Sequence, residues 1–290
     1  MANLRDIKRR IKSVRNTSQI TKAMQMVASA KMRRAQDLAL KGRNYMSALA
    51  RVFSHLQETI ADANSPLMTE RENGKELIIV VSTDRGLCGG LNSNLLREVL
   101  QNAPKDADYV TVGSKLNSQL ARCGRNLVAT FSVGDAIEES ELKPIFDFVK
   151  NSFTDGTYRS VKVMYQKFIN IMVQRPQTTT LLPIDKEELL HIAEEDEVAS
   201  TTTTASNFLL EPGPTALLNS ILPLYIGHLL VQMILEGKAS EQSARMVAMK
   251  SATENAKTLI GELTLEYNKA RQTQITNELL EITTAMKAME

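Results

Sequence analysis

The sequence predicts a small, partly parallel α/β domain inserted between two long terminal helices that pair as an antiparallel coiled coil. Both ends of the chain lack proline over long stretches and place apolar residues at helical spacing, whereas the middle alternates short β-branched runs with helical segments. Aromatic residues make up only 4% of the chain and Trp is absent, which favours helix packing over an aromatic-rich β core.

The first predicted element is one helix from Asn3 to about Ile60, closed by Asn64, Ser65 and Pro66. Its apolar residues follow the alternating 3,4 spacing of a coiled-coil seam in two stretches: Leu4, Ile7, Ile11 and Val14, then Tyr45, Leu49, Val52, Leu56 and Ile60. Between the stretches the spacing shifts to Ile20, Met24 and Val27. Such a phase slip predicts a local unwinding or bend of the supercoil.

A second long helix is predicted from about Pro214 to the last few residues, roughly 100–110 Å at 1.5 Å per residue. Its seam alternates without a break through Met249, Thr253, Ala256, Ile260, Leu263, Tyr267 and Ala270. A further phase slip precedes Ile275, Leu279, Ile282 and Met286. Each helix offers a narrow seam, so pairing satisfies both, and the longer C-terminal helix should protrude as a single-helix tip.

The middle of the chain carries the predicted α/β domain. Strands are expected at residues 77–82, 109–112, 127–131, 160–168 and 178–182, with helices at 93–101 and 142–153. Alternation of this kind predicts a partly parallel, Rossmann-like sheet. The predicted organisation is therefore an N-terminal coiled-coil helix at 1–62, a globular domain at 75–210 and a C-terminal coiled-coil helix at 214–290.

The sequence signals no catalytic, cofactor or metal site. The glycine-rich turn at 83–92 lies between a strand and a helix, where phosphate can bind, yet it matches neither GxxxxGK[ST] nor GxGxxG, so a structural turn is favoured over nucleotide binding. Cys88 and Cys123 form no CxxC pair, and the histidines His55, His191 and His228 share no ligand spacing.

Charge is distributed unevenly along a chain whose net charge is +2. Residues 1–51 hold 13 Lys/Arg and two Asp, a net charge of +11, which predicts acidic partners and leaves a nucleic-acid-binding coiled coil as an alternative. No aromatic residue precedes Tyr45, which weakens the case for single-strand binding. The acidic tract Asp185–Glu197 is interpreted as a solvated loop.

Three segments resemble the gamma subunit of F-type ATP synthases, of the bacterial type. They are Asn16–Ala28 with Lys31–Arg34, the glycine-rich 82–92, and Ser240–Lys250 continuing through Tyr267–Gln272 to Ile275 and Thr276. Lys167–Asn170 is also similar to the family, whereas 185–204 does not align. Three matches in the right order over nearly the whole chain are more specific than any short motif.

The resemblance implies a non-catalytic central-stalk rotor subunit without a cofactor. Its coiled coil would stand inside a ring of three alpha and three beta subunits, and its α/β domain would lie beside epsilon and the proton-driven c-ring. The protein would then be peripheral, on the cytoplasmic side of the bacterial inner membrane. Proton-driven rotation would be coupled to ATP synthesis or hydrolysis on the beta subunits.

The resemblance also implies roles for individual residues. Lys22, Met24 and Arg245 would face the beta-subunit lever loops, and Arg271, Gln272 and Thr276 would contact the upper catalytic loops. Phe208 and Glu211 would belong to the foot that approaches the c-ring and epsilon. The C-terminal end, 285–289, departs from the Gly/Ala-rich ending that is common in the family.

Overall fold

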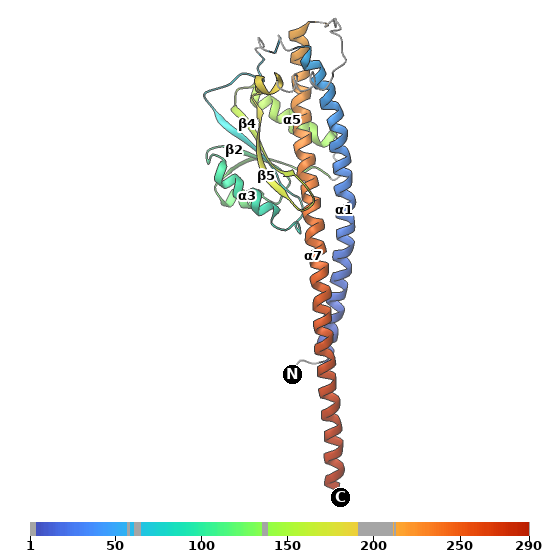
Figure 1. The fold of residues 1–290 in the computed structure, drawn as a ribbon. Helices are drawn as coiled ribbons and strands as arrows, with labels where there is room; N and C mark the ends of the chain where they lie inside the picture. The colour runs from blue at the N-terminus through green and yellow to red at the C-terminus, as the bar shows by residue number, and fades with distance from the viewer. Residues whose placement is uncertain are drawn as a thin grey trace. The chain divides into compact units, whose positions relative to one another are not determined.

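A computed structural model describes residues 4–56, 59–60, 65–134, 139–190, 211 and 213–289. The chain divides into two compact units: residues 1–29 with 245–290, and residues 30–244. The elements α1 (Leu4–Ser54) and α7 (Pro214–Met289) each contribute residues to both units (Figure 1). The predicted fold class, an α/β domain with long N- and C-terminal helices, is confirmed.

The larger unit contains a five-stranded sheet in the order β3-β2-β1-β4-β5. Its strands are β1 (Lys75–Val81), β2 (Asp108–Val112), β3 (Asn126–Phe131), β4 (Tyr158–Phe168) and β5 (Gln174–Leu182). Four strands are parallel and β5 pairs antiparallel with β4. Both neighbours of β1 are parallel to it and its apolar run is buried, as expected for the central strand of an α/β sheet.

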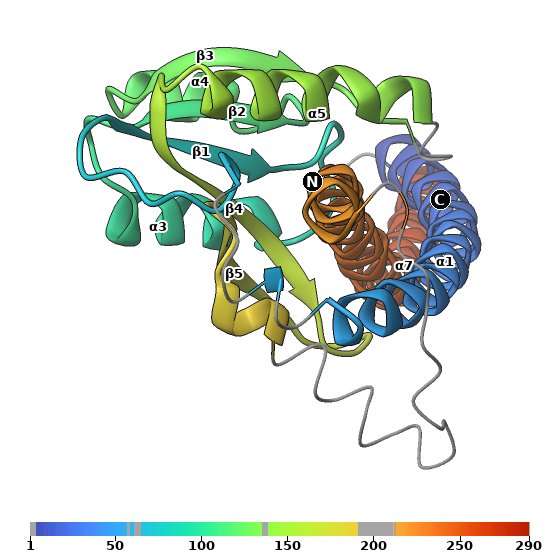
Figure 2. The same ribbon diagram turned by 90° about the horizontal axis from the view of Figure 1, so that it is seen from above.

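Helices cover both faces of this sheet. Its α/β helices are α3 (Leu91–Asn102), α4 (Asn117–Arg122) and α5 (Glu139–Thr154). Alternate β1 side chains divide the core: Ile78 and Val80 pack with α3 and α4, whereas Leu77, Ile79 and Val81 pack with α5, the end of α1 and the first turns of α7. Figure 2 shows α3 and α5 on opposite sides of the sheet.

The helix α4 was not predicted, since a six-residue helix gives too short a periodic signal. The predicted N-terminal helix is interrupted near its end, because α1 ends at Ser54 and residues 55–56 form a turn, whereas residues 59–60 are helical as predicted. The other predicted strands and helices are confirmed to within four residues at each end, and α7 begins at Pro214 as predicted. Pro is well placed at a first helical position, where its missing N–H needs no partner.

The seam of α1 differs from the prediction. Buried or half-buried positions recur at 4, 7, 11, 14, 18, 21, 25, 28, 32, 35, 39, 42, 46, 49 and 53, an unbroken 3,4 alternation. The predicted phase slip is therefore wrong: Ile20 and Val27 are 60% and 54% exposed, and small or polar residues such as Ser18, Thr21 and Ala28 continue the seam instead. An uninterrupted seven-residue repeat predicts an even left-handed supercoil rather than a local bend.

The first thirty residues of α7 belong to the core of the larger unit. Leu218, Leu222, Tyr225, Ile226 and Ile234 are at most 1% exposed and pack with the sheet. The helix contains an 18-residue window that is long and apolar enough to cross a membrane, but 44% of that window is buried inside the protein. The expectation that no later run of about 18 residues is apolar enough to span a bilayer is therefore wrong, and the burial fits a helix that packs in the core of the larger unit.

Candidate functional site

The smaller unit is a pair of helical segments, α1 up to Ser29 and α7 from Arg245, joined by a narrow seam. The α7 side of the seam buries Met249, Thr253, Ala256 and Leu263, as predicted. The hydroxyls of Thr21 and Thr253 lie 2.7 Å apart in this seam. Each hydroxyl can also donate within its own helix, Thr253 Oγ1 to the Met249 carbonyl oxygen at 2.8 Å and Thr21 Oγ1 to that of Ser18 at 3.1 Å, and either can be the donor of the cross-helix bond.

Beyond the seam, α7 continues as an unpaired end. Every residue from Arg271 to Met289 is exposed, a length of about 28 Å at 1.5 Å per residue. The predicted single-helix tip is confirmed. The apolar side chains Ile275, Leu279, Ile282 and Met286 are 47–66% exposed, so they form no seam within this chain.

The residues predicted to contact other subunits lie in different surroundings. Arg271, Gln272 and Thr276 are exposed on the unpaired end of α7, where Thr276 Oγ1 donates to the Gln272 carbonyl oxygen at 2.9 Å. Lys22 is exposed on α1, and Met24 is half-buried. Arg245 is only 7% exposed, which the sequence did not indicate.

The predicted foot residues are only partly described. Glu211 is exposed and lies three residues before the first turn of α7. Phe208 lies outside the described residues, as does most of the acidic tract.

The glycine-rich turn between β1 and α3 closes on itself through polar contacts. Asn92 Nδ2 donates to Thr83 Oγ1 at 2.7 Å, and Thr83 Oγ1 donates to the Arg85 carbonyl oxygen at 2.9 Å. The backbone turns through left-handed conformations at Leu87 (φ 64°) and Gly89 (φ 60°). These contacts support the predicted structural turn, since the polar side chains at its base bind the turn itself.

The carboxyl edge of the sheet, where a doubly wound fold would bind a nucleotide, carries α7 instead. The strand order reverses between β1 and β4, which makes their carboxyl ends the topological switch point. Gly237 of α7 lies directly on the end of β1: a Cβ atom there would come within 2.9 Å of Val81 Cγ1. The helix therefore lies against the carboxyl end of the central strand.

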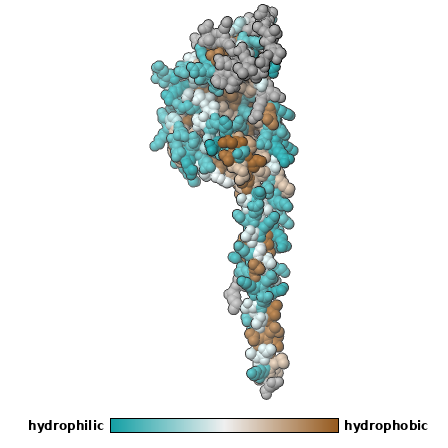
Figure 3. All heavy atoms as spheres, in the orientation of Figure 1, coloured by the Kyte–Doolittle hydropathy of each residue, from teal (hydrophilic) through white to brown (hydrophobic). Residues whose placement is uncertain are grey.

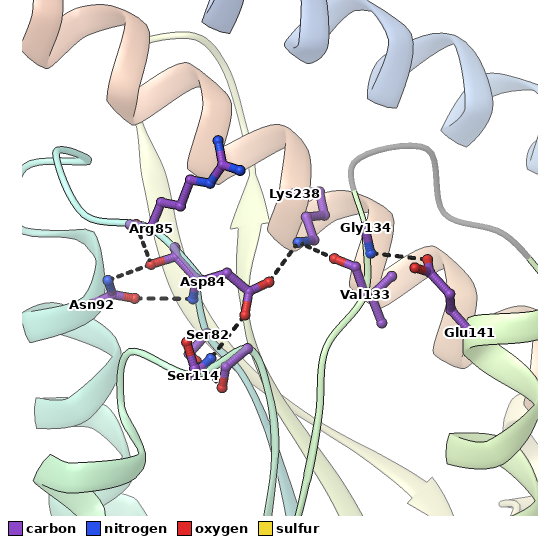
Figure 4. Close-up of polar contacts among 11 residues, drawn as sticks. Ser82, Asp84, Arg85, Asn92, Ser114, Val133, Gly134, Glu141 and Lys238 are labelled. Carbon is purple, nitrogen blue, oxygen red and sulfur yellow. Dashed lines mark hydrogen bonds and ion pairs between the residues drawn. The ribbon is translucent and has the colours of Figure 1, made fainter.

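A buried lysine joins α7 to the loops that follow three of the strands (Figure 4). Lys238, 8% exposed, donates from Nζ to the Val133 carbonyl oxygen at 2.8 Å, after β3, and lies 3.6 Å from Asp84 Oδ2, after β1. Asp84 Oδ1 in turn accepts from the Ser114 backbone N–H at 3.1 Å, after β2. This cluster gives no signal in the sequence, because nothing in the order of the residues links Lys238 to Asp84.

The amino edge of the sheet is braced by ionic contacts. Glu76 on β1 accepts from Arg159 at 2.9 Å and from Lys162 at 3.0 Å, both on β4. Burial acts to raise the pKa of Glu76, but hydrogen bonds and charge from Lys162 and Arg159 outweigh it and hold that pKa below its ordinary value. Burial and the charge of Asp108, whose Oδ2 accepts from the Tyr158 hydroxyl at 3.1 Å, raise the pKa of Tyr158 to about 12.

The described residues include no group of three or more His, Cys, Asp or Glu that could hold a metal ion. Cys88 is buried and Cys123 is exposed. His228 contacts the Tyr45 ring, with ring centroids 4.9 Å apart, and His191 lies outside the described residues.

Exposed apolar side chains gather at the hairpin between β4 and β5. Ile169, Ile171, Met172 and Val173 are 36–74% exposed, and Figure 3 shows a hydrophobic patch over this hairpin beside α7. The Ser243 hydroxyl of α7 donates to the Ile171 carbonyl oxygen at 2.8 Å, which holds the base of the hairpin.

Comparison with known proteins gives concordant results. A family model described as ATP synthase matches residues 3–289. The ATP synthase gamma chain of Akkermansia muciniphila is 60% identical over 100% of both chains, and that of Opitutus terrae is 43% identical over 99% of each.

Solved structures with a similar fold come from mitochondrial ATP synthases. The fold resembles a chain in the Euglena gracilis OSCP/F1/c-ring structure, with a TM-score of 0.68, 20% identity and coverage of 99% of this chain and 94% of that one. A chain of the Tetrahymena thermophila central stalk and c-ring is 25% identical, with a TM-score of 0.58 over 80% of this chain and 99% of that one.

Proposed function

The chain belongs to the gamma-chain family of ATP synthases, and on that premise we propose that it turns as the central shaft of the complex. The resemblance predicted from the three sequence segments is thereby confirmed. As a member of this family the chain is a subunit of the complex, with catalysis on the beta subunits. Its proposed role is to couple proton-driven rotation of a c-ring to ATP synthesis or hydrolysis in a ring of three alpha and three beta subunits.

The observation that carries the proposal is the paired segment with its unpaired end. The seam of the smaller unit extends to Ala270, and the following 19 residues, to Met289, are exposed on all sides. An isolated helix with exposed apolar side chains is poorly stabilised in water, because most helical stability in proteins comes from packing. A surrounding sleeve of other subunits would supply that packing.

The shaft would act by differential contact. A partner shifts a conformational equilibrium only through unequal contacts with its states, so the shaft must present different surfaces to three equivalent sites. A pair of helices, or a single helix, has no threefold symmetry and meets this requirement without a bend. The mechanism therefore does not depend on the phase slip that was predicted in α1.

Roles for individual residues follow from the family motifs. The upper loops of the ring are proposed to contact Arg271, Gln272 and Thr276, which are exposed on the unpaired end. The beta-subunit lever loops are proposed to contact Lys22 and Met24 on α1. For Arg245, whose side chain is buried, a contact would be limited to its exposed part. Glu211 and Phe208 are proposed for the foot beside the c-ring and epsilon.

The basic N-terminal segment then faces protein surfaces rather than nucleic acid. Its net charge of +11 suits acidic surfaces of the partner subunits. Through the complex the chain would be peripheral to the cytoplasmic side of the bacterial inner membrane. The three predicted segments, 1–62, 75–210 and 214–290, are proposed as the shaft, foot and shaft of this rotor.

The proposal is tested by affinity purification of the tagged chain from gently solubilised membranes. Recovery of one copy with three alpha and three beta subunits and with Mg-ATPase activity is expected, while the pure chain alone should hydrolyse no ATP. Recovery of the chain alone, or with nucleic acid in a salt-sensitive complex, would contradict it.

A further inference from the structure

Residues 237–243 of α7 contact the ends of β1, β3 and β4 and the β4–β5 hairpin. Gly237 packs on Val81 of β1, and Lys238 binds the loops after β3 and β1. Ser240 Oγ donates to the Gln166 carbonyl oxygen of β4 at 2.8 Å, and Ser243 Oγ to that of Ile171 in the hairpin at 2.8 Å. Both serines are fully buried.

These contacts surround the helix in the order of the strands. Successive helical residues are rotated by about 100°, so relative to the side chain of Lys238 position 237 faces about 100° away, and the side chains of Ser240 and Ser243 point about 160° and 220° away in the same sense. The corresponding sheet positions run from β3 through β1 to β4 and the hairpin, which is their order across the sheet. The carboxyl edge therefore encloses well over half of the circumference of α7.

We propose that Lys238 at one end of this arc, with Ser240 and Ser243 at the other, forms a torsional clamp that stops α7 from turning about its own axis within the α/β domain. This inference rests on the proposed rotor function. A torque about the helix axis moves the two ends of the arc in opposite directions, so bonds at both ends resist it together. Gly237 permits the close approach but offers no directional bond.

Lys238 can resist such a torque more strongly than a serine can. Its ammonium group lies between a backbone carbonyl and the Asp84 carboxylate, and a hydrogen bond with an ionised partner is about twice as strong as a neutral one. Asp84 is itself fixed by the Ser114 backbone N–H, and Lys115 N donates to the Thr83 carbonyl oxygen at 3.0 Å, so the loops after β1 and β2 move as one piece. Figure 4 shows this network around Lys238.

The test uses the whole complex in proteoliposomes with three variants of the chain: Lys238→Met, Ser243→Ala and the double variant. ATP hydrolysis without an opposing proton gradient should stay within about twofold of the wild type, because little torque is then transmitted. ATP-driven proton pumping against a large gradient should fall by about threefold in Lys238→Met and further in the double variant. Lys105→Met, an exposed lysine on the same domain, serves as the matched control and should pump normally.

The ratio of pumping to hydrolysis separates the clamp from simple destabilisation. Loss of folded complex lowers both activities together and leaves the ratio unchanged, and an unchanged ratio in the double variant would overturn the inference. If Lys238→Met does not assemble, Asp84→Asn is judged by the same ratio, since it removes the facing charge but keeps an acceptor for Ser114. Failure of the wild-type complex to pump would instead contradict the proposed function.

Discussion

Thr21 and Thr253, 232 positions apart in the sequence, place their hydroxyl oxygens 2.7 Å apart in the buried seam between α1 and α7. Both side chains are less than 10% exposed. A polar pair at a seam position costs some stability compared with an apolar pair but fixes the register of a coiled coil. The pair therefore sets which residues of the two helices face each other in the smaller unit.

We expect the two threonines to be energetically coupled. Thr21→Val and Thr253→Val should each lower the free energy of unfolding by about 1 kcal/mol, because each leaves the other hydroxyl without its cross-helix partner. The double variant should lose less than the sum, with a coupling energy of at least about 0.5 kcal/mol. Urea unfolding followed by circular dichroism measures this, with exposed Thr258→Val as control. Strict additivity would contradict the hydrogen bond.

Two glycines of α7 should respond in opposite directions to the same change. Gly237→Ala should destabilise the chain by about 1–3 kcal/mol, because its Cβ would come within 2.9 Å of Val81 Cγ1. Gly261→Ala, where a Cβ would meet nothing within 4 Å, should stabilise the helix by about 0.5–1 kcal/mol. Thermal unfolding of both variants checks the prediction. Recovery of stability in the Gly237→Ala, Val81→Ala double variant would locate the clash.

Acid should weaken the packing around His228. Burial lowers the pKa of this side chain below its ordinary value of 6.5. Near and below that pH, His228 therefore binds a proton more readily in the unfolded chain than in the folded chain. Stability should consequently fall as the pH drops through 6.5 towards the pKa of the folded state. His228→Gln should reduce the difference in unfolding free energy between about pH 7.5 and about pH 5.5. An unchanged difference would rule this cause out, and exposed His55→Gln is the control.

The unpaired end of α7 should matter for activity and not for folding. Arg271→Ala with Gln272→Ala removes side chains that are exposed in the chain, so unfolding should change by less than about 0.5 kcal/mol. In the assembled complex, ATP hydrolysis should fall by about tenfold if these side chains hold the upper loops. The exposed Lys257→Ala serves as control. Full activity of the double variant would remove the proposed contact.

Much of this fold could be predicted from periodicity. The central strand β1 is a continuous β-branched run, and the seam from Met249 to Leu263 keeps an apolar 3,4 spacing, so each gives a clear signal. The α1 seam was misjudged at Ser18 and Thr21 because their burial depends on a partner helix rather than on their own hydrophobicity. The apolar Ile20 and Val27 produced an apparent phase slip although they are exposed.

Contacts between distant segments could not be predicted. The first turns of α7 were expected to form a narrow seam, yet Leu218 to Ile234 offer a broad face to the sheet, a distinction that tertiary packing decides. Lys238 meets Asp84 and Val133 only because α7 lies across the carboxyl edge. The resemblance of the terminal segments identified the family without revealing this cluster.

Rotation of the chain inside the ring tests the central claim most directly. Cys123 is exposed on the α/β domain whereas Cys88 is buried, so a bead or a fluorescent rod can be attached at one native position. With the alpha and beta subunits immobilised and ATP supplied, the probe should turn in one direction in discrete steps, three to a revolution for a ring of three catalytic sites. A probe that stays still while the same complexes hydrolyse ATP would contradict the account.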